Sequence, residues 1–422
     1  MRHWSWDLYN CSVDLKARLS HLSPPKSPDA DRDATLSTLR ERMSEILQRP
    51  VEGPRAPADP SRTTLPFAEH ARDEGVLHQR LDTVPASYRV GSMPVASALD
   101  ADSEMLALLA LDPALAGVDP ARALYVDTET TGLGTGAGVL AFLVGLAWYE
   151  DGKLMLEQLL IRRPGEEAGM LALLAERVSR AEFLVSFNGK AFDLPLLGTR
   201  CVMNRRKALP QRPHLDLLHV GRRLHKRRLG RCKLKDLESH VLGFERDGDI
   251  EGGDVAARYA HFLRSGDEEA LFQVVEHNAW DVISMVALVG VYGEATERLR
   301  PEELLELAKT LRRAKAVERA GDVVDLAVAR GVGADAVRLR GQMAKARGDR
   351  KSALADFESL LTEIDDPELR LDLAKLYEHY LKAPKAALEL LDAGTSESDA
   401  ADLKRRARLE RKVEKAERGG RG

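Results

Sequence analysis

Apolar and polar positions divide the chain into three parts with different patterns. In residues 1–64 one helical pattern is readable, at 35–48, where Leu39, Met43 and Leu47 fall on a single helix face. Prolines crowd the stretch that follows it. Such a composition favours an extended, disordered segment over a packed core. We therefore expect an N-terminal helix joined to the rest of the chain by a disordered linker.

Residues 65–120 carry a firmer pattern. They predict a strand at 76–81 and a short helix at 103–110. Two Asp-Pro pairs, at 112–113 and 119–120, then interrupt the chain. We interpret this part as a lead-in that packs on the domain that follows.

Residues 121–292 alternate between strand and helix patterns and form the predicted central domain. The expected elements are strands at 123–127, 139–149 and 154–161, a helix at 166–178, a strand at 183–187 and a helix from about Asp193, with helices thereafter. The turn between the second and third strands, Glu150-Asp-Gly-Lys153, is typical of a hairpin. Hairpin-linked strands followed by alternating helix and strand predict a mixed α/β sheet flanked by helices.

Beyond Pro301 the composition shifts to Ala, Leu, Glu, Lys and Arg at helical spacing. We expect an all-α domain over 300–395, with helices at 302–319, 322–330, 334–347, 350–363, 367–381 and 384–392. The stretches 371–380 and 386–391 resemble a tetratricopeptide-like helical pair, with a plain helical bundle as the alternative. Either arrangement suits a docking surface for a protein partner. The basic residues 396–422 predict a fraying helix or a weak electrostatic arm.

Composition places few limits on function. The 422 residues carry 63 basic and 67 acidic side chains, a net charge of −4, so the global charge says nothing about partners. The three cysteines, Cys11, Cys201 and Cys232, have no metal-ligand spacing, which fits a reducing compartment. The first residues lack the apolar core of a signal peptide, and the longest apolar run, 139–149, is too short to span a bilayer. We expect a cytoplasmic protein with no membrane contact.

The first residues that indicate chemistry are Asp127 and Glu129, at the end of a predicted strand. Residues two apart in a strand point to the same face, so both carboxylates should project from one side. Like charges so close are costly unless a cation neutralises them, and oxygen ligands of this kind suit Mg²⁺ or Mn²⁺. An isolated Asp-x-Glu pair is also a common chance arrangement with both side chains in water.

Two further motifs lie downstream. Asn188, Phe192 and Asp193 fall where a predicted strand ends and a helix begins, a position that helix capping by the carboxylate would also explain. His277 and Asp281 lie four residues apart and share a face of a predicted helix. A surface hydrogen bond would account for that pair if it stood alone.

Together the three motifs resemble those of the DEDD exonuclease superfamily of ribonuclease H-like nucleases. That family has Asp-x-Glu on its first strand, Asn-x-x-x-Phe-Asp after a later strand, and a His or Tyr shortly before a final Asp on a helix. More narrowly, Asp-Thr-Glu-Thr-Thr-Gly-Leu from Asp127, the strand at 141–145, Asp216-Leu-Leu and His277-Asn-x-x-Asp281 are similar to the YprB-type branch of bacterial proteins. That branch also carries helical repeats, so the resemblance covers most of residues 75–395. It implies an RNase H-like sheet and a 3′-5′ exonuclease acting on single-stranded RNA or DNA.

The resemblance also implies two divalent cations, Mg²⁺ or Mn²⁺, held by four carboxylates. Asp127 would bridge the two cations and Asp193 would bind one of them. Glu129 and Asp281 would bind the cation that activates water, and His277 would orient or deprotonate that water.

The position of His277 departs from the family. The family places a Tyr four residues before the last Asp or a His five before it, whereas His277 lies four before Asp281. One residue rotates a helix by about 100°. Whether His277 reaches the water is therefore open, and Asn278 is a less favoured substitute.

Residues 200–235 hold 13 Lys or Arg and a single acid, Asp216. We expect this stretch to border the metal site and bind a phosphate backbone. The predicted nucleic-acid-binding residues are Asn188, Phe192, Arg205, Arg206, Lys207, Arg222, Arg223, Lys226, Arg227 and Arg228. The stretch has no aromatic residue, so base stacking is not indicated, and a solvated helix face is the alternative.

Two other functions stay open. A catalytically dormant RNase H-like adaptor would bind nucleic acid and recruit partners through its helical repeats. The irregular spacing of His277 favours the adaptor, and the presence of all four carboxylates opposes it. An endonuclease of the RNase H or resolvase type is disfavoured because Asp127 and Glu129 share one strand. No residue distinguishes RNA from DNA.

Overall fold

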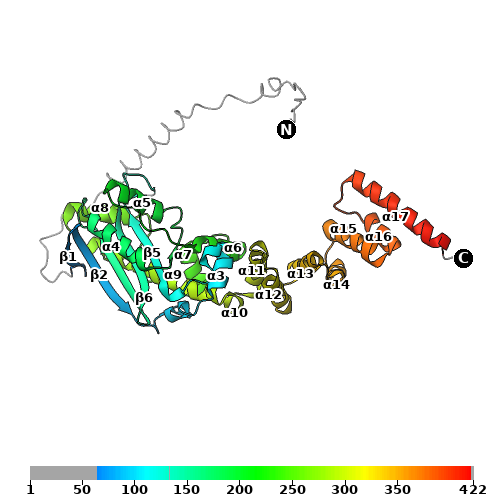
Figure 1. Ribbon diagram of the computed structural model, residues 1–422, viewed down its shortest axis with the longest axis horizontal. Coiled ribbons are helices and arrows are strands. Elements are labelled where there is room, and N and C mark those ends of the chain that lie inside the picture. The colour runs from blue at the N-terminus through cyan, green and yellow to red at the C-terminus, as the bar shows by residue number, and fades with distance from the viewer. Residues whose placement is uncertain (1–63, 133, 420–422) are drawn as a thin grey trace, which may run out of the picture. The chain divides into compact units, whose positions relative to one another are not determined.

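The structure is a computed structural model that describes residues 64–132 and 134–419 (Figure 1). The N-terminal helix and proline-rich linker expected before residue 64 lie outside the described residues. The described part contains a mixed sheet followed by a long series of helices, as the sequence predicted.

A seven-stranded sheet forms the central domain. In sheet order its strands are β1 (Ala68–Arg72), β2 (Gly75–Val84), β7 (Lys153–Leu160), β6 (Ala141–Glu150), β5 (Ala123–Thr130), β8 (Phe183–Ser186) and β9 (His214–Asp216). The pairs from β1 to β5 in this order are antiparallel, whereas β5, β8 and β9 are mutually parallel. A separate ribbon pairs β3 (Arg89–Val90) with β4 (Met93–Pro94). The expectation for residues 65–120 needs one correction. We expected them to pack on the central domain, but their strands β1 and β2 also extend its sheet beyond β7.

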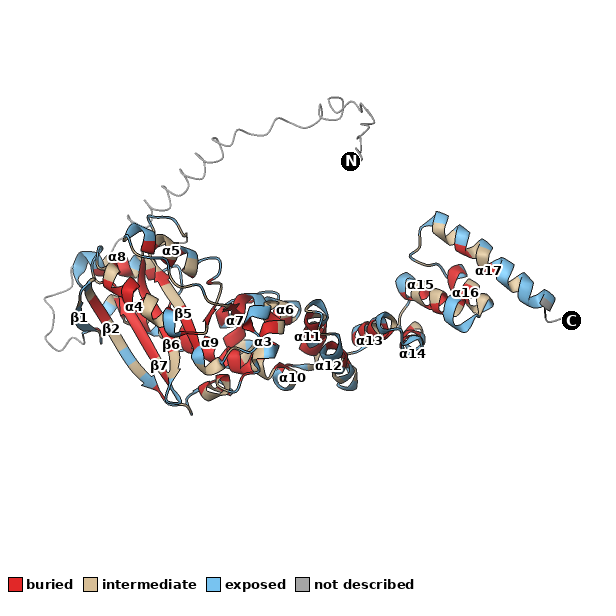
Figure 2. Cartoon of the chain, viewed as in Figure 1, coloured by how far each residue is buried: buried red, intermediate tan, exposed pale blue. Residues whose placement is uncertain are grey.

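Helices cover both faces of this sheet (Figures 1 and 2). The helices of this part of the chain are α3 (Ser103–Ala110), α4 (Glu167–Arg180), α5 (Asp193–Met203), α6 (Leu217–Leu229), α7 (Leu234–Leu237), α8 (Val255–Ser265), α9 (Glu269–Gly293) and α10 (Ala295–Arg298), of which α10 contacts α9 and α11 instead of the sheet. The short turns are η1 (Val95–Ala98), η2 (Pro113–Leu115), η3 (Pro120–Arg122) and η4 (Glu238–Leu242).

The alternation of residues along β5 decides which helices meet each face. Tyr125 belongs to a core with α3, α6 and the second half of α9. Leu124 and Val126, which point the other way, belong to a core with α4, α5 and α8. Asp127 and Glu129 continue the series of Tyr125, so the end of β5 presents both carboxylates toward α9.

Helix α9 is the central helix of the domain and packs on β5 and β6. It is long and apolar enough to cross a membrane, but 83% of its apolar window is buried inside the protein. Gly293 permits close packing, since a Cβ there would lie 2.5 Å from the Cα of Ala101. Because α9 is packed this tightly, its polar residues are held at the end of β5 in nearly fixed positions.

The helical region begins directly against the central domain. Arg228 Nε and His225 Nδ1, both on α6, each lie 2.7 Å from the Glu303 carboxylate at the start of α11. The other ring nitrogen of His225 lies 3.2 Å from the hydroxyl of Tyr292, at the end of α9. Because these side chains are buried apart from Arg228, which is partly exposed, their polar groups satisfy one another.

The six helices expected over 300–395 are present, with different boundaries. They are α11 (Pro301–Arg313), α12 (Val317–Ala329), α13 (Ala334–Arg347), α14 (Arg350–Leu361), α15 (Pro367–Leu376), which η5 (Tyr377–Leu381) continues, and α16 (Pro384–Asp392). A further helix, α17 (Asp399–Gly419), follows them. The first expected turn, around Gly321, is wrong. The chain turns at Lys315 instead, with a φ of 64°, and Gly321 lies inside α12.

The basic C-terminal stretch forms the helix α17, and this helix packs on α16 instead of fraying or extending as a free arm. Leu409 on α17 is fully buried. Arg405 and Lys412 contact the buried carboxylate of Glu378 at 2.9 and 2.8 Å. The sequence did not indicate this packing, because α17 is rich in charged residues and Leu409 alone contributes much of its buried apolar surface.

We predict that Leu409→Ala lowers the free energy of unfolding of the C-terminal helices by about 2–5 kcal/mol, because it opens a cavity in a packed core. Leu403→Ala on the same helix is the control, since Leu403 is 66% exposed. It should change stability by less than about 0.5 kcal/mol. Urea denaturation followed by circular dichroism measures both; equal effects would mean that α17 does not pack.

Candidate active site

The site is built at the end of β5, where Asp127 pairs in register with Gly145 of β6. A Cβ at Gly145 would lie 2.3 Å from the side-chain oxygen of Asn278. Only glycine therefore leaves room for the α9 amide to approach the sheet. Gly145 therefore lies beside Asp127, the residue whose carboxylate the Asn278 amide holds.

Asn278 links Asp127 to the interior of the sheet. Its Nδ2 donates to Asp127 Oδ2 at 2.8 Å, and its Oδ1 accepts from Gln158 Nε2 at 2.9 Å. Asn278 and Gln158 are fully buried, and Gln158 also donates to the backbone oxygen of Val275. This chain of amides fixes the rotamer of Asp127.

Asp193 enters the site at the first turn of α5 and accepts a hydrogen bond from the Thr128 hydroxyl of β5. The loop before it is held by Asp216 at the end of β9. The backbone N–H groups of Asn188 and Lys190 donate to the Asp216 carboxylate at 2.8 and 3.1 Å. Asn188 itself has a φ of 70°, which asparagine tolerates better than most residues. Asp216 thus positions the loop that brings Asp193 to β5.

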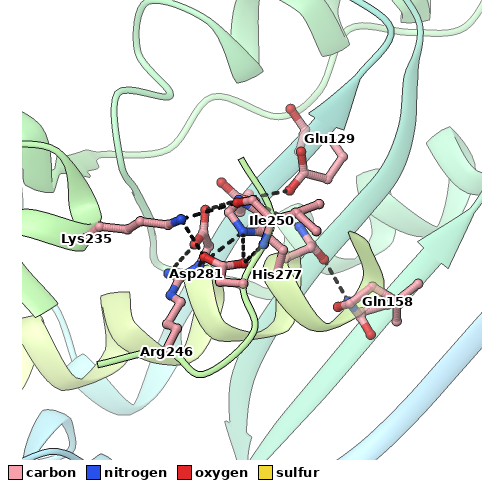
Figure 3. A network of polar contacts seen from close by, with 12 residues as sticks. Glu129, Gln158, Lys235, Arg246, Ile250, His277 and Asp281 are labelled. Carbon is pink, nitrogen blue, oxygen red and sulfur yellow. Dashed lines mark hydrogen bonds and ion pairs between the residues drawn. The ribbon is translucent and has the colours of Figure 1, made fainter. Parts of the chain in front are cut away.

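His277 and Asp281 of α9 complete the group that the sequence predicted. His277 Nε2 lies 3.9 Å from Glu129 Oε1 and 3.8 Å from Asp281 Oδ2. One ligand atom from each of these three residues lies within 4.8 Å of the other two. The structure therefore brings Glu129 of the first motif together with His277 and Asp281 of the third motif around one small space (Figure 3).

Sequence reasoning missed Arg246, whose side chain is only 3% exposed. Its guanidinium contacts Asp281 Oδ1 and lies 2.5 Å from Glu238 in η4 and 3.3 Å from Asp249 (Figure 3). Burial opposes the charged form, but Asp281 and Glu238 outweigh it and raise the pKa of Arg246. Asp281 Oδ1 is thus occupied, while Oδ2 remains turned toward His277.

Asp249 was missed as well. It accepts from Lys235 Nζ at 2.8 Å and lies 2.6 Å from His277 Nδ1. Arg246 Nη1 lies farther from the same nitrogen, at 3.3 Å. The shorter contact identifies Nδ1–H as donor and Asp249 as acceptor, so Nε2 carries the free side of the imidazole.

The carboxylates repel one another in a buried space. Burial, followed by the charges of Asp281 and Glu129, raises the pKa of Asp127 well above its ordinary value. Burial and then the charges of Asp281 and Asp193 raise the pKa of Glu129 to about 8. Burial also raises the pKa of Asp193 to about 6, against the opposing hydrogen bond from Thr128.

This donor set fits a hard divalent cation. Four oxygen donors that cannot all be charged at low cost are stabilised when a cation binds between them. Asp127, Glu129, Asp193 and Asp281 are the residues that would hold such ions.

The basic residues divide between two surroundings. A groove of about 600 Å³ lies beside the loop that carries Asp193. It is lined by Phe187 and Asn188, the cations Arg222, Lys226, Arg231 and Lys233, and Leu218, Gly230, Cys232 and Leu234. Two predicted nucleic-acid-binding cations therefore lie in the groove, together with two that were not singled out.

Other predicted cations are engaged in contacts within the protein. Arg223 donates to the backbone oxygen of Leu109 at 2.8 Å, and Arg227 lies 2.6 Å from Asp335. Arg228 binds Glu303, as described above, and Arg206 lies 3.5 Å from Glu74. Arg205 and Lys207 are exposed after α5, and Phe192 is 47% exposed at the start of α5.

Comparison with known proteins supports the fold. Residues 124–292 match the RNase_H superfamily. Over 299 residues the chain is 30% identical to "Uncharacterized protein YprB" of Bacillus subtilis (strain 168), covering 68% of this chain and 72% of that protein. The family B DNA polymerase of the hyperthermophilic archaeon Pyrobaculum calidifontis aligns with a TM-score of 0.34 and 14% identity, over 53% of this chain and 29% of the polymerase.

Residues 124–292 thus form an RNase H-like domain. The chain belongs to the family of the Bacillus subtilis protein YprB, as the sequence resemblance implied.

The raised pKa of Glu129 predicts how stability depends on pH in the metal-free protein. Its folded pKa of about 8 exceeds the ordinary 4.5, so the folded state holds a proton that the unfolded state releases. The stabilising contribution is full below about pH 4.5 and is lost as pH rises through about 8. Thermal unfolding from pH 5 to 8.5 should show a falling Tm, and Glu129→Gln should flatten the fall. Glu410→Gln, on an exposed residue of α17, should leave the profile of the parent protein unchanged.

Proposed function

We propose that this protein is a metal-dependent nuclease of the DEDD type that removes nucleotides from the 3′ end of single-stranded nucleic acid. The observation that carries the proposal is the group of Glu129 on β5 with His277 and Asp281 on α9, with Asp127 and Asp193 close enough to raise the pKa of Glu129 or to have their own pKa raised by it. Such a cluster is costly for stability, and a metal site for phosphodiester hydrolysis explains the cost.

The chain's own residues supply the positioning. Asn278 holds Asp127 and the Thr128 hydroxyl holds Asp193, while Arg246 holds one oxygen of Asp281 and leaves the other facing the site. When bound, two divalent cations would clamp the attacking and leaving oxygens and make the attacking water more acidic. His277 borders the same space, with Nε2 3.9 Å from Glu129 Oε1, and would orient or deprotonate that water.

The groove beside Asn188 is the proposed path of the substrate backbone. Its four cations would contact the phosphates of a single strand. Among the described residues, the only aromatic one in the lining is the partly buried Phe187, so the groove offers little surface on which bases could stack. A groove that recognises the charge and shape of the backbone, and not the bases, suits single strands of varied sequence. The helical region from α11 to α17 is proposed, as a tetratricopeptide-like array, to serve protein contacts.

The dormant adaptor remains the second candidate because Arg246 places a permanent positive charge on Asp281. An internal cation reduces the repulsion that a metal ion would otherwise relieve. Both candidates predict binding of nucleic acid in the groove, but only the nuclease predicts cleavage.

The test of the nuclease is cleavage of 5′-labelled single-stranded RNA and DNA with Mn²⁺ or Mg²⁺. We expect a ladder that shortens from the 3′ end and disappears in Asp127→Asn, because the variant loses a carboxylate that would hold the cations. Asp151→Asn makes the same chemical change in the exposed β6–β7 turn and should cleave like the parent. Internal cuts would indicate an endonuclease, and binding without cleavage would favour the adaptor.

The test of the groove is the salt dependence of binding to a single-stranded oligonucleotide. Arg222→Ala with Lys226→Ala should lower the slope of log K against log salt by about 0.7 for each phosphate that the variant no longer neutralises. Arg350→Ala with Lys351→Ala removes the same charges from α14 and is the control. An unchanged slope in the groove variant would place the substrate elsewhere.

A further inference from the structure

His277 has a free ring nitrogen directed at two carboxylates without hydrogen-bonding to either. Nε2 lies 3.9 Å from Glu129 Oε1 and 3.8 Å from Asp281 Oδ2, beyond hydrogen-bond length. Two ligands on one cation, each at about 2.1 Å, lie roughly 3–3.5 Å apart. The three atoms are therefore spaced as donors around a shared centre, which a small inward movement would complete.

The other side of the imidazole is built as metal-binding histidines usually are. Such histidines donate the second N–H to a carboxylate or carbonyl, which fixes the tautomer and orients the ring. Asp249 provides that acceptor at 2.6 Å from Nδ1, and it is held in turn by Lys235. Its side chain is only 6% exposed, and that of His277 is 12% exposed, so solvent competes little for the contact.

We propose that His277 is itself a metal ligand, and that Glu129, His277 and Asp281 form a mixed oxygen and nitrogen site. The inference rests on the proposed function, and it changes the role of His277 from a base acting on water to a ligand. A single Nε2 lone pair cannot bind a cation and accept a proton at the same time. Asp249 is the positioning residue for this ligand.

A nitrogen donor changes which cation the site selects. Mg²⁺ takes oxygen ligands and keeps several waters, whereas imidazole suits first-row transition cations. Two carboxylates and one imidazole therefore favour a transition cation such as Mn²⁺ over Mg²⁺. An all-carboxylate site would lack this discrimination.

The experiment is pulsed electron paramagnetic resonance of substoichiometric Mn²⁺ bound to the full chain, without substrate. We expect a ¹⁴N coupling from directly bound imidazole. His277→Gln should lose the coupling and bind Mn²⁺ at least tenfold more weakly, while its affinity for Mg²⁺ changes much less. His70→Gln is the matched control, because His70 is exposed on β1, four strands away from β5. It should retain both the coupling and the affinity.

A second variant separates the positioning role of Asp249 from ligation. Asp249→Asn should keep the ¹⁴N coupling but weaken Mn²⁺ binding by about 10–100-fold, the usual cost of losing an outer partner of a ligand.

The outcomes distinguish this inference from the proposed function. Tight Mn²⁺ binding by the parent protein without ¹⁴N coupling would overturn the role of His277 as a ligand and leave the carboxylate nuclease standing. Equal weakening of Mg²⁺ and Mn²⁺ in His277→Gln would overturn the selectivity. No binding of Mn²⁺ at all would overturn both the inference and the metal-dependent nuclease.

Discussion

Mutual repulsion among four buried or partly buried carboxylates is the constraint on which the rest of the site depends. The fold meets it by giving Asp127, Asp193 and Asp281 a donor each: an amide, a hydroxyl and a guanidinium. No donor among the described residues hydrogen-bonds the Glu129 side chain, and its pKa is raised to about 8. Glu129 therefore gains stabilisation when a cation binds, and it is one of the three ligands of the proposed mixed site.

The residues that hold the carboxylates are positioned as closely as the carboxylates themselves. Asn278 reaches Asp127 only because Gly145 leaves the space open, and the amide stays in one orientation because Gln158 holds its oxygen. Every member of this buried chain is satisfied by the next, which is the condition under which polar groups rigidify a core. The close packing of α9 on β5 and β6 makes the frame possible, because a looser helix would separate amide and carboxylate.

Sequence reasoning found the carboxylates because their spacing follows the local geometry of strand and helix. Asp127 and Glu129 share a face through the period of a strand, and the RNase H-like sheet follows from the order of the elements. Arg246 and Asp249 could not be found in this way. They lie between helices in a stretch without periodicity, and they reach α9 across 28 to 35 residues. Only the folded chain brings them to Asp281 and His277, so sequence spacing contains no sign of them.

The basic stretch shows why a charge count overestimates a binding surface. Arg222 and Lys226 lie four residues apart on α6 and face the groove. Arg223 and Arg227, one residue further on, lie on another face and bind Leu109 and Asp335. Because each residue of a helix is rotated by about 100° from the one before it, neighbouring cations point in different directions and make different contacts. The same helix that lines the proposed substrate path thus also contacts α11 and α13, and the charge available to a phosphate backbone is that of one face of α6 together with Arg231 and Lys233.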